Sequence, residues 1–277
     1  MRELAIDARA ASKNEMESAP TPPLLELEHV SVQRGDRLAL NNLSLRIDAH
    51  ERVAILGPNG CGKSTLVRTI TRDFYPLHKP GTRMAIFGQE RWHVFALRKL
   101  LGVVSASLVE ANTRDICGLE AVLSGYFASV GVHDEFTQEM LDHSYAALEQ
   151  LRVSYLAERP MTEMSSGEAW RVILARAIVH QPKALLFDEP SSHLDIAARA
   201  GLFNSLRELV HSGTGLVMVT HHFADIIPEI DRVILLRDGR VFADGPVASI
   251  LTAQQLSAAF QAEIRVERAP DGHILAW

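Results

Sequence analysis

The 277-residue chain has only two cysteines, Cys61 and Cys117, and it lacks any long apolar run. Two cysteines are too few for a disulfide framework, which favours a reducing compartment. A helix that crosses a bilayer needs about 18 or more consecutive apolar residues, so none is predicted. The first twenty residues carry charges throughout and have no apolar core, which argues against a cleavable secretion signal. These absences predict a cytosolic protein.

The sequence also has no excess of positive charge. Lys and Arg number 28 against 34 Asp and Glu, which gives a formal net charge of -6. No overall positive field attracts nucleic acid, and no direct nucleic-acid contact is expected. Hydrophobic residues make up 47% of the chain and charged residues 22%, which is ordinary for a globular protein and excludes disorder as the main state.

Apolar patterning predicts two kinds of strand. Apolar residues alternate with polar ones around residues 25–28 and 43–47, as in half-buried antiparallel strands. Continuous apolar runs at 53–57, 183–189 and 215–222 predict central parallel strands covered on both faces. Because helical sequence joins these runs, we predict a doubly wound α/β core whose ligands lie at the carboxyl ends of the strands.

The rest of the chain is predicted more coarsely. Between the first two buried strands, the pattern predicts one further strand, over residues 102–107. The segment from about 109 to 180 is predicted to be an inserted helical subdomain. Asp238 and Gly239 separate two apolar runs, a strong hairpin signal. The tail begins as a helix and ends in the apolar ILAW. The predicted division is a flexible, Pro-rich leader over 1–23, one domain over 24–247 and a C-terminal extension over 248–277.

The segment GPNGCGKST, residues 57–65, satisfies the phosphate-binding pattern G-x-x-x-x-G-K-[ST] between a strand and a helix. Its glycines let successive N–H groups point inward, where they and the helix N-terminus bind phosphate oxygens. Lys63 is expected to reach the β and γ phosphates, and Ser64 to ligate Mg²⁺. An ordinary turn would match by chance with a probability on the order of one per cent. The predicted ATP-binding residues here are Gly57, Pro58, Asn59, Gly60, Cys61, Gly62, Lys63, Ser64 and Thr65.

Polar residues end the other two predicted buried strands. Asp188 and Glu189 end one; in a P-loop fold the first acid holds magnesium and the second deprotonates the attacking water. Alone they would equally well cap a helix, but beside a P-loop they favour hydrolysis. Thr220, His221 and His222 end the other. Neighbours on a strand point to opposite faces, so the two histidines are not predicted to share a metal.

These residues together resemble the ATP-binding cassette (ABC) ATPase family over about residues 24–247. The segment MSSGE, residues 164–168, is similar to the family signature, usually Leu-Ser-Gly-Gly-Gln. The sequence alone predicts a capping box there, from Ser165 and Glu168. Residues 191–195 resemble the D-loop at the subunit interface, and His221 matches the switch histidine. The resemblance adds to the ATP site Ser165, Ser166, Gly167, Glu168 and Asp195.

The resemblance implies a P-loop NTPase core with an antiparallel β subdomain and an inserted helical subdomain. It implies a transporter's ATP-hydrolysing subunit, which pairs head to tail with a second copy around two Mg-ATP. Glu189 would be the general base, His221 would stabilise the γ-phosphate geometry, and Lys63 would neutralise developing charge. Ser64 and Asp188 would hold the metal. A separate transmembrane permease at the cytosolic face of the membrane is implied, and the cargo would not touch this subunit.

Three positions depart from the family pattern. Arg34 stands where an aromatic residue often stacks on adenine. A guanidinium can also stack on a base, and the alternative interpretation, an arginine that is only solvated, has equal weight. Ala106 aligns near the usual Gln that contacts Mg²⁺, and Ser105 or Ser107 would be left to supply a hydroxyl. Cys61 lies at a helix N-terminus, which lowers a thiol pKa, although a small residue that fits between glycines is favoured.

Two further interpretations concern the kind of ABC ATPase. The runs LLGVVSASL, VLSGYFASVG and MSSGEAWRVILARA are similar to a subgroup named for molybdate transport or photorepair. The alternative to transport is a soluble ABC ATPase that acts on a nucleic-acid, ribosomal or repair partner, which the missing Gln favours. A single cassette without sustained heptads argues against it. A P-loop kinase or GTPase is disfavoured by the signature and the acidic pair.

Overall fold

The computed structural model describes residues 21–112, 116–127, 136–191, 194–269 and 274–276. A six-stranded sheet lies at its centre, with strand order β5-β6-β7-β3-β8-β9. The strands of this sheet are β5 (Leu101–Ser105), β6 (Ala184–Asp188), β7 (Gly215–Val219), β3 (Arg52–Leu56), β8 (Arg232–Arg237) and β9 (Arg240–Pro246). All neighbours are parallel except β8 and β9. The predicted α/β fold is confirmed, and the predicted leader lies outside the described residues except for 21–23.

The three continuous apolar runs form the middle of this sheet, as predicted. Every residue of β7 is buried. In β3 only Arg52 is partly exposed, and in β6 only Asp188 is partly exposed. Parallel pairing sets Asp188 beside Val219, and Val219 beside Ile55. The carboxyl ends of β3, β6 and β7 therefore lie along one edge of the sheet, where ligands bind in open α/β folds.

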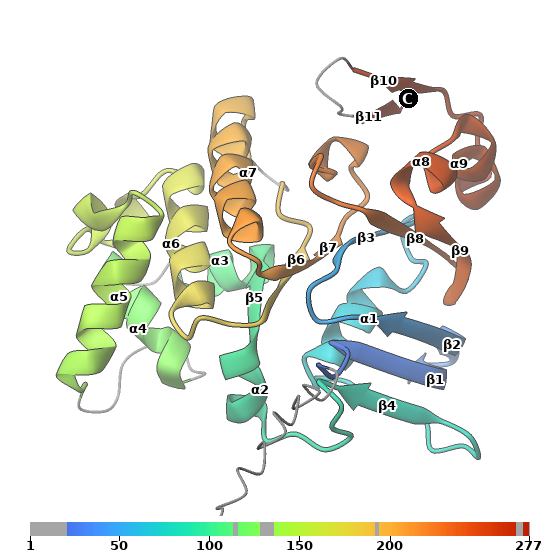
Figure 1. Ribbon diagram of the computed structural model, residues 1–277, viewed down its shortest axis with the longest axis horizontal. Helices are drawn as coiled ribbons and strands as arrows, with labels where there is room; N and C mark the ends of the chain where they lie inside the picture. The colour runs from blue at the N-terminus through green and yellow to red at the C-terminus, as the bar shows by residue number, and fades with distance from the viewer. Residues whose placement is uncertain (1–20, 113–115, 128–135, 192–193, 270–273, 277) are drawn as a thin grey trace, which may run out of the picture.

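A smaller antiparallel sheet has the order β2-β1-β4. Its strands are β1 (Leu25–Arg34), β2 (Arg37–Ile47) and β4 (Arg83–Ile86). The predicted alternation is confirmed, since Leu25 pairs with Ile47 and Leu27 with Leu45, and all four are buried. The sequence pattern does not predict β4, because four residues are too few to show a period of two. Figure 1 shows this sheet beside the larger one, below β8 and β9.

Helices cover the sheet and form a group of their own. Three of them, α4, α5 and α6, lie side by side at one end of the molecule (Figure 1). The described helices are α1 (Lys63–Ile70), α2 (Val94–Leu100), α3 (Ala106–Asn112), α4 (Gly118–Phe127), α5 (Gln138–Gln150), α6 (Ser166–Ile178), α7 (Ile196–His211), α8 (Val247–Ile250) and α9 (Ala253–Phe260), with short 3₁₀ turns η1 (Ser154–Leu156), η2 (Met161–Glu163) and η3 (Phe223–Asp225). Since α3 begins at Ala106, the strand predicted over 102–107 ends two residues early. None of these described helices combines the length and the apolar character that a bilayer span requires.

The predicted hairpin after β8 is confirmed. Asp238 and Gly239 both have positive φ, 52° and 73°, as the two-residue turn between twisted antiparallel strands requires. The turn also contacts the phosphate loop, because Gly239 N donates a hydrogen bond to the Cys61 carbonyl at 2.9 Å. The tail ends in a two-stranded sheet of β10 (Val266–Arg268) and β11 (Ile274–Ala276), which is held on the body by the buried Ile274.

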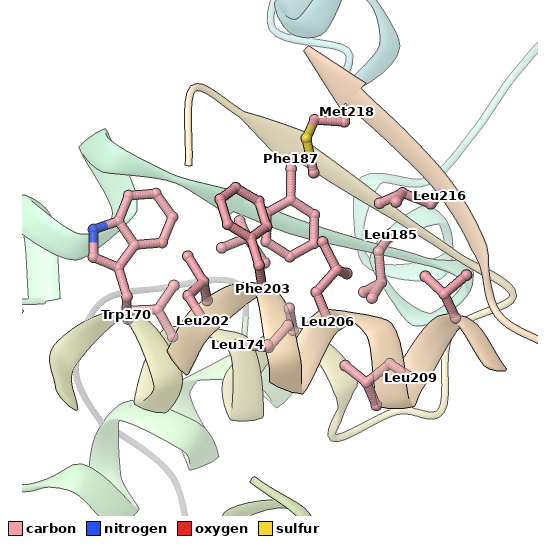
Figure 2. Packing of buried hydrophobic residues seen from close by; sticks show 14 of the residues in the cluster. Trp170, Leu174, Leu185, Phe187, Leu202, Phe203, Leu206, Leu209, Leu216 and Met218 are labelled. Carbon is pink, nitrogen blue, oxygen red and sulfur yellow. The ribbon is translucent and has the colours of Figure 1, made fainter. Parts of the chain in front are cut away.

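The largest core lies between the sheet and helices α6 and α7. Figure 2 shows apolar side chains of α7 directed at those of β6 and β7, with Phe187 at the centre. Phe187 has no exposed surface and is among the largest fully buried side chains. The labelled members of the cluster are Trp170, Leu174, Leu185, Phe187, Leu202, Phe203, Leu206, Leu209, Leu216 and Met218. This core fixes the strand from which the acidic pair projects.

We expect Phe187→Ala to lower the free energy of unfolding by about 3 to 5 kcal/mol, because the removed ring leaves a cavity in a packed core. Phe95→Ala is the matched control, since Phe95 is 48% exposed and its loss is expected to cost less than about 0.5 kcal/mol. Urea denaturation followed by circular dichroism measures both. Equal midpoints for the two variants would contradict this account of the core.

Candidate functional site

The phosphate loop runs from the end of β3 to the start of α1, and its glycines are required by its shape. Gly60 and Gly62 have φ of 77° and 113°, values that other residues rarely adopt. A Cβ added at Gly62 would lie 2.5 Å from the Ala39 carbonyl oxygen, closer than any real Cβ contact. Backbone conformation therefore favours glycine at both positions, and close packing of the loop against β2 additionally requires it at Gly62.

Lys63, the first residue of α1, folds back over this loop. Its Nζ donates hydrogen bonds to the carbonyl oxygens of Gly57 at 2.7 Å and Pro58 at 3.1 Å, and the residue is 5% exposed. The first turn of α1 contains no acidic residue, so its backbone N–H groups and the partial positive charge of the helix end are available to an anion. Lysine and helix end together make a site for phosphate oxygens.

Cys61 is buried in the loop, and one expectation about it is wrong. Burial raises the pKa of its thiol above the usual value and outweighs Lys63 and the backbone N–H groups, which lower it. The alternative interpretation, a small residue that fits between glycines, agrees with the packing. A Cβ added at Gly57 would lie 2.7 Å from the Cys61 sulfur. The thiol fills the inside of the loop and is a poor nucleophile there.

Asp188 ends β6 at the carboxyl edge of the sheet. Burial, and secondarily the neighbouring Glu189, raises the pKa of the Asp188 carboxyl to about 6, although Lys63 and Arg68 lower it. Its Oδ1 atom is buried and has no hydrogen-bond partner among the described residues. Ser64 and Asp188 line the same cavity. A carboxylate oxygen without a partner, close to a hydroxyl and to a phosphate site, fits the oxygen ligands that Mg²⁺ prefers.

Glu189 follows in a strained conformation, with φ of 51°. Its N–H donates to the Val219 carbonyl at 2.8 Å, which ties it to the end of β7. Its Oε1 atom lies 3.1 Å from His221 Nδ1. Positive φ at a residue other than glycine costs roughly 1 to 3 kcal/mol and is typical of functional sites. The structure therefore brings the predicted general base and the predicted switch histidine together.

The two adjacent histidines do not point to opposite faces, contrary to the sequence prediction. The ring centroids of His221 and His222 lie 3.9 Å apart, with the planes tilted by 40°. The prediction was wrong because β7 ends at Val219, so both histidines follow in a turn where strand alternation does not apply. Among the described residues, no group of three or more His, Cys, Asp or Glu is arranged to hold a metal ion.

A cavity of about 550 Å³ opens beside the phosphate loop. Arg34 and Glu189 line it together with Lys63 and Ser64. The Arg34 guanidinium lies over the ring of Phe74 at 5.0 Å. Arg68 lies over the same ring at 5.4 Å. The role of Phe74 could not be predicted from sequence, because no pattern local to it indicates that it supports Arg34.

A second cavity, of about 400 Å³, reaches from Ser64 and Glu189 to α6. Ala106, near which the resemblance aligns the usual Gln, lines it together with Ser105 and Ser107. Ser105 Oγ lies 3.0 Å from Ser107 Oγ and accepts a hydrogen bond from Leu108 N at 3.3 Å. Both serine hydroxyls that the sequence offers in place of the Gln side chain therefore line this cavity. The Ser105 hydroxyl also accepts a hydrogen bond at the start of α3.

The signature segment forms the capping box that the sequence predicts. Ser165 Oγ accepts a hydrogen bond from Glu168 N at 3.3 Å, and Glu168 Oε2 accepts one from Ser165 N at 2.9 Å. The hydrogen bond from the Ser165 backbone N–H, and to a lesser extent the one from the Ser165 hydroxyl, hold the pKa of Glu168 below its usual value. Gly167 packs on α7, where an added Cβ would lie 2.7 Å from the Ala198 Cβ. A side chain at 167 would push the helix tip away from α7.

The structure does not bring this helix tip to the phosphate loop. Ser165 and Ser166 are exposed, and none of residues 165–168 is among the described residues that line the cavity with Lys63. Asp195 caps α7, since its Oδ1 accepts a hydrogen bond from Ala198 N at 2.7 Å. Its neighbour Ile196 is 90% exposed. Residues 192–193 of the predicted D-loop lie outside the described residues.

Comparison with known proteins agrees with this geometry. A family model described as ABC transporter matches residues 40–192, more than half of the chain. The uncharacterized ABC transporter ATP-binding protein YlmA of Bacillus subtilis is 31% identical over 248 residues, 88% of this chain and 93% of the relative. The hemin import ATP-binding protein HmuV of Hahella chejuensis is 31% identical over 246 residues, 86% of this chain and 92% of the relative.

A solved structure adds the quaternary arrangement of one similar protein. The dimeric structure of MJ0796, a bacterial ABC transporter cassette, is 25% identical, covers 80% of this chain and 98% of its own, and has a TM-score of 0.66. The same cassette is also solved as a dimeric post-hydrolysis state bound to ADP and Pi, with a TM-score of 0.64.

We expect Asp188→Asn to stabilise the nucleotide-free protein above about pH 7 by roughly 1 to 3 kcal/mol. The folded-state pKa of about 6 lies above the ordinary value of 3.8, so ionised Asp188 costs free energy that disappears as the pH falls toward 4. Urea denaturation across this pH range, without nucleotide or Mg²⁺, measures the difference. Asp142→Asn, at an exposed position of α5, is the control. A variant less stable than the parent at pH 8 would contradict this assignment.

Proposed function

The chain belongs to the ABC transporter family, as an ATP-binding and ATP-hydrolysing subunit, and from that premise we propose that two copies pair head to tail around two Mg-ATP. One observation carries the proposal: the capped tip of α6 is exposed and does not line the cavity that Lys63 lines. A helix tip of this kind binds anions. Only a second copy can bring it to the terminal phosphate held by the first.

Within each half-site the side chains divide the work. The loop from Gly57 to Thr65 binds the phosphates through its N–H groups, with Lys63 directed to the terminal ones. Ser64 and Asp188 would hold Mg²⁺, which neutralises charge that develops on the transferred phosphoryl group. Glu189 takes the proton of the attacking water. His221, 3.1 Å from Glu189, orients that carboxylate and would stabilise the geometry of the γ-phosphate.

Adenine binding is assigned to the other end of the cavity. Arg34 lines the same cavity as the phosphate loop and already stacks on Phe74. A guanidinium held flat by one aromatic ring can receive a base on its other face. Ser165, Ser166, Gly167 and Glu168 of the second copy would close the site over the γ-phosphate, and Asp195 would lie at the interface.

We further propose a separate transmembrane permease, so that the subunit works at the cytosolic face of a membrane. The hemin import relative supports transport, and a soluble ATPase acting on nucleic acid or ribosomes is not favoured. The cavity between α2 and α6 is a suitable docking place, since the apolar side chains of Val94 and Leu97 line it together with Glu189.

A partly buried cation, Arg176, lines the same cavity. Burial, with Arg98 nearby, lowers the pKa of Arg176 to about 10. Its Nε donates to Ser124 Oγ at 2.9 Å, and no described acidic residue forms an ion pair with it. A permease segment with an acidic side chain would pair with Arg176 in this low-dielectric site.

The cargo is expected to contact the permease. The resemblance to the molybdate or photorepair subgroup rests on short runs of sequence, whereas one relative is named a hemin import ATP-binding protein. We propose that the permease, and not this subunit, contacts the cargo, because the described cavities near the nucleotide loop are those assigned to ATP and to docking.

Glu189→Gln should bind ATP as the parent does, accumulate as an ATP-bound dimer, and lose hydrolysis by about a hundredfold or more, because the general base is removed while the site keeps its shape. Phosphate release, ATP binding by equilibrium dialysis and mass by light scattering measure the three effects. Glu149→Gln, an exposed position on α5, is the control. Turnover at the parental rate would exclude Glu189 as the base.

Val94→Asp should leave the ATPase activity of the isolated subunit within about twofold and abolish its stimulation by the reconstituted permease, since a charge in the apolar wall opposes docking. Tyr145→Asp is the matched control; Tyr145 is 45% exposed on α5, away from the cavity. If both variants retain full stimulation, docking in this cavity is wrong.

A further inference from the structure

A fully buried carboxylate, Asp225, contacts both loops of the catalytic edge without having a role in the mechanism above. It is 0% exposed. Its Oδ2 accepts hydrogen bonds from Ser191 Oγ at 2.9 Å and from Thr220 Oγ1 at 2.6 Å. Arg199 Nη2 lies 3.3 Å from its Oδ1. A buried carboxylate is costly unless it is paired and hydrogen-bonded, and here each partner comes from a different segment.

The positions of these partners relate the carboxylate to the reaction. Ser191 follows Glu189 by two residues, and Thr220 immediately precedes His221. One oxygen of Asp225 therefore joins the loop that carries the general base to the loop that carries the switch histidine. The two loops meet at their other end in the Glu189–His221 contact of 3.1 Å, so the carboxylate closes a ring of contacts.

Thr220 extends the network into the histidine turn. Its Oγ1 donates to Asp225 and accepts a hydrogen bond from His222 N at 3.0 Å. The Asp225 N–H in turn donates to the His222 carbonyl at 3.1 Å. These three bonds fix the turn that places His221 beside Glu189, rather than in the alternating geometry of a strand.

Arg199 connects the same carboxylate to α7. It lies in the first turns of this helix, four residues after Asp195, which caps it. The Arg199 guanidinium also lies 5.5 Å over the ring of Phe203, which limits its freedom. Arg199 therefore provides a direct contact between Asp225 and the start of α7, where Asp195 and the exposed Ile196 lie.

We propose that Asp225 is a positioning residue for ATP hydrolysis, which holds Glu189 and His221 in register and links their geometry to the start of α7. The proposal rests on the proposed roles of Glu189 and His221. It assigns the network to the hydrolysis step and not to ATP binding, because none of its four members lines the cavity beside the phosphate loop.

Asp225→Asn tests this inference in the full-length protein. The amide retains the shape and one acceptor oxygen, but it places an N–H₂ group toward a hydroxyl or toward Arg199. We expect kcat to fall by about tenfold or more while the KM for ATP changes by less than about twofold. Thr220→Val, which removes one hydroxyl from the network with little change of shape, should act in the same direction.

Glu229→Gln is the matched control for stability. Glu229 is also nearly buried, at 8% side-chain exposure, and pairs with Arg207 of α7 at 2.6 Å, but it contacts neither catalytic loop. Asp225→Asn and Glu229→Gln should both lower the free energy of unfolding, and only the first should lower kcat. Similar kcat losses in the two variants would show that Asp225 acts through stability alone and overturn the proposal.

A double-mutant cycle separates positioning from a general effect. If Asp225 acts through the Glu189–His221 contact, Asp225→Asn should have little further effect in a His221→Ala background. Full additivity of the two losses would overturn the inference. Failure of the proposed function is distinguishable, because in that case Glu189→Gln would itself retain parental hydrolysis.

Discussion

The parallel hydrogen-bonded register of β6, β7 and β3 is the constraint on which the site depends. It sets Asp188 beside Val219 and Val219 beside Ile55, so three loops that are distant in sequence start from one edge of the sheet. The phosphate loop, the acidic pair and the histidine turn are these three loops. Each strand is anchored by an apolar core, which fixes the start of each loop, and hydrogen bonds such as that from Glu189 N to the Val219 carbonyl hold the polar groups beyond it.

That edge places two adjacent carboxylates, Asp188 and Glu189, in partly buried positions. Asp188 has a raised pKa and an oxygen without a described partner, and Glu189 has a strained backbone beside it. Neither feature helps the fold by itself. Both are typical of a site arranged for a ligand that supplies the missing positive charge and hydrogen bonds, so this part of the molecule sacrifices stability for binding and catalysis.

Local sequence patterns predicted the phosphate loop, the capping box of α6, the Asp238–Gly239 turn and the central strands, because each depends on neighbouring residues. Features that depend on long-range packing were missed or mistaken. Strand β4 is too short to show alternation, burial reversed the expected pKa of Cys61, and the end of β7 placed both histidines in a turn. The Asp225 network joins segments up to 34 residues apart in sequence, and no spacing rule indicates it.

Ile196 stands almost wholly in solvent at the start of α7, next to the capping Asp195. In the proposed head-to-tail arrangement Asp195 lies at the interface, and covering the neighbouring Ile196 there would add to association an apolar component that does not depend on nucleotide. Hydrophobic attraction weakens on cooling. Pairing of the two copies should consequently be weaker in the cold than in warm solution, so the temperature of handling becomes a variable in any preparation of this protein.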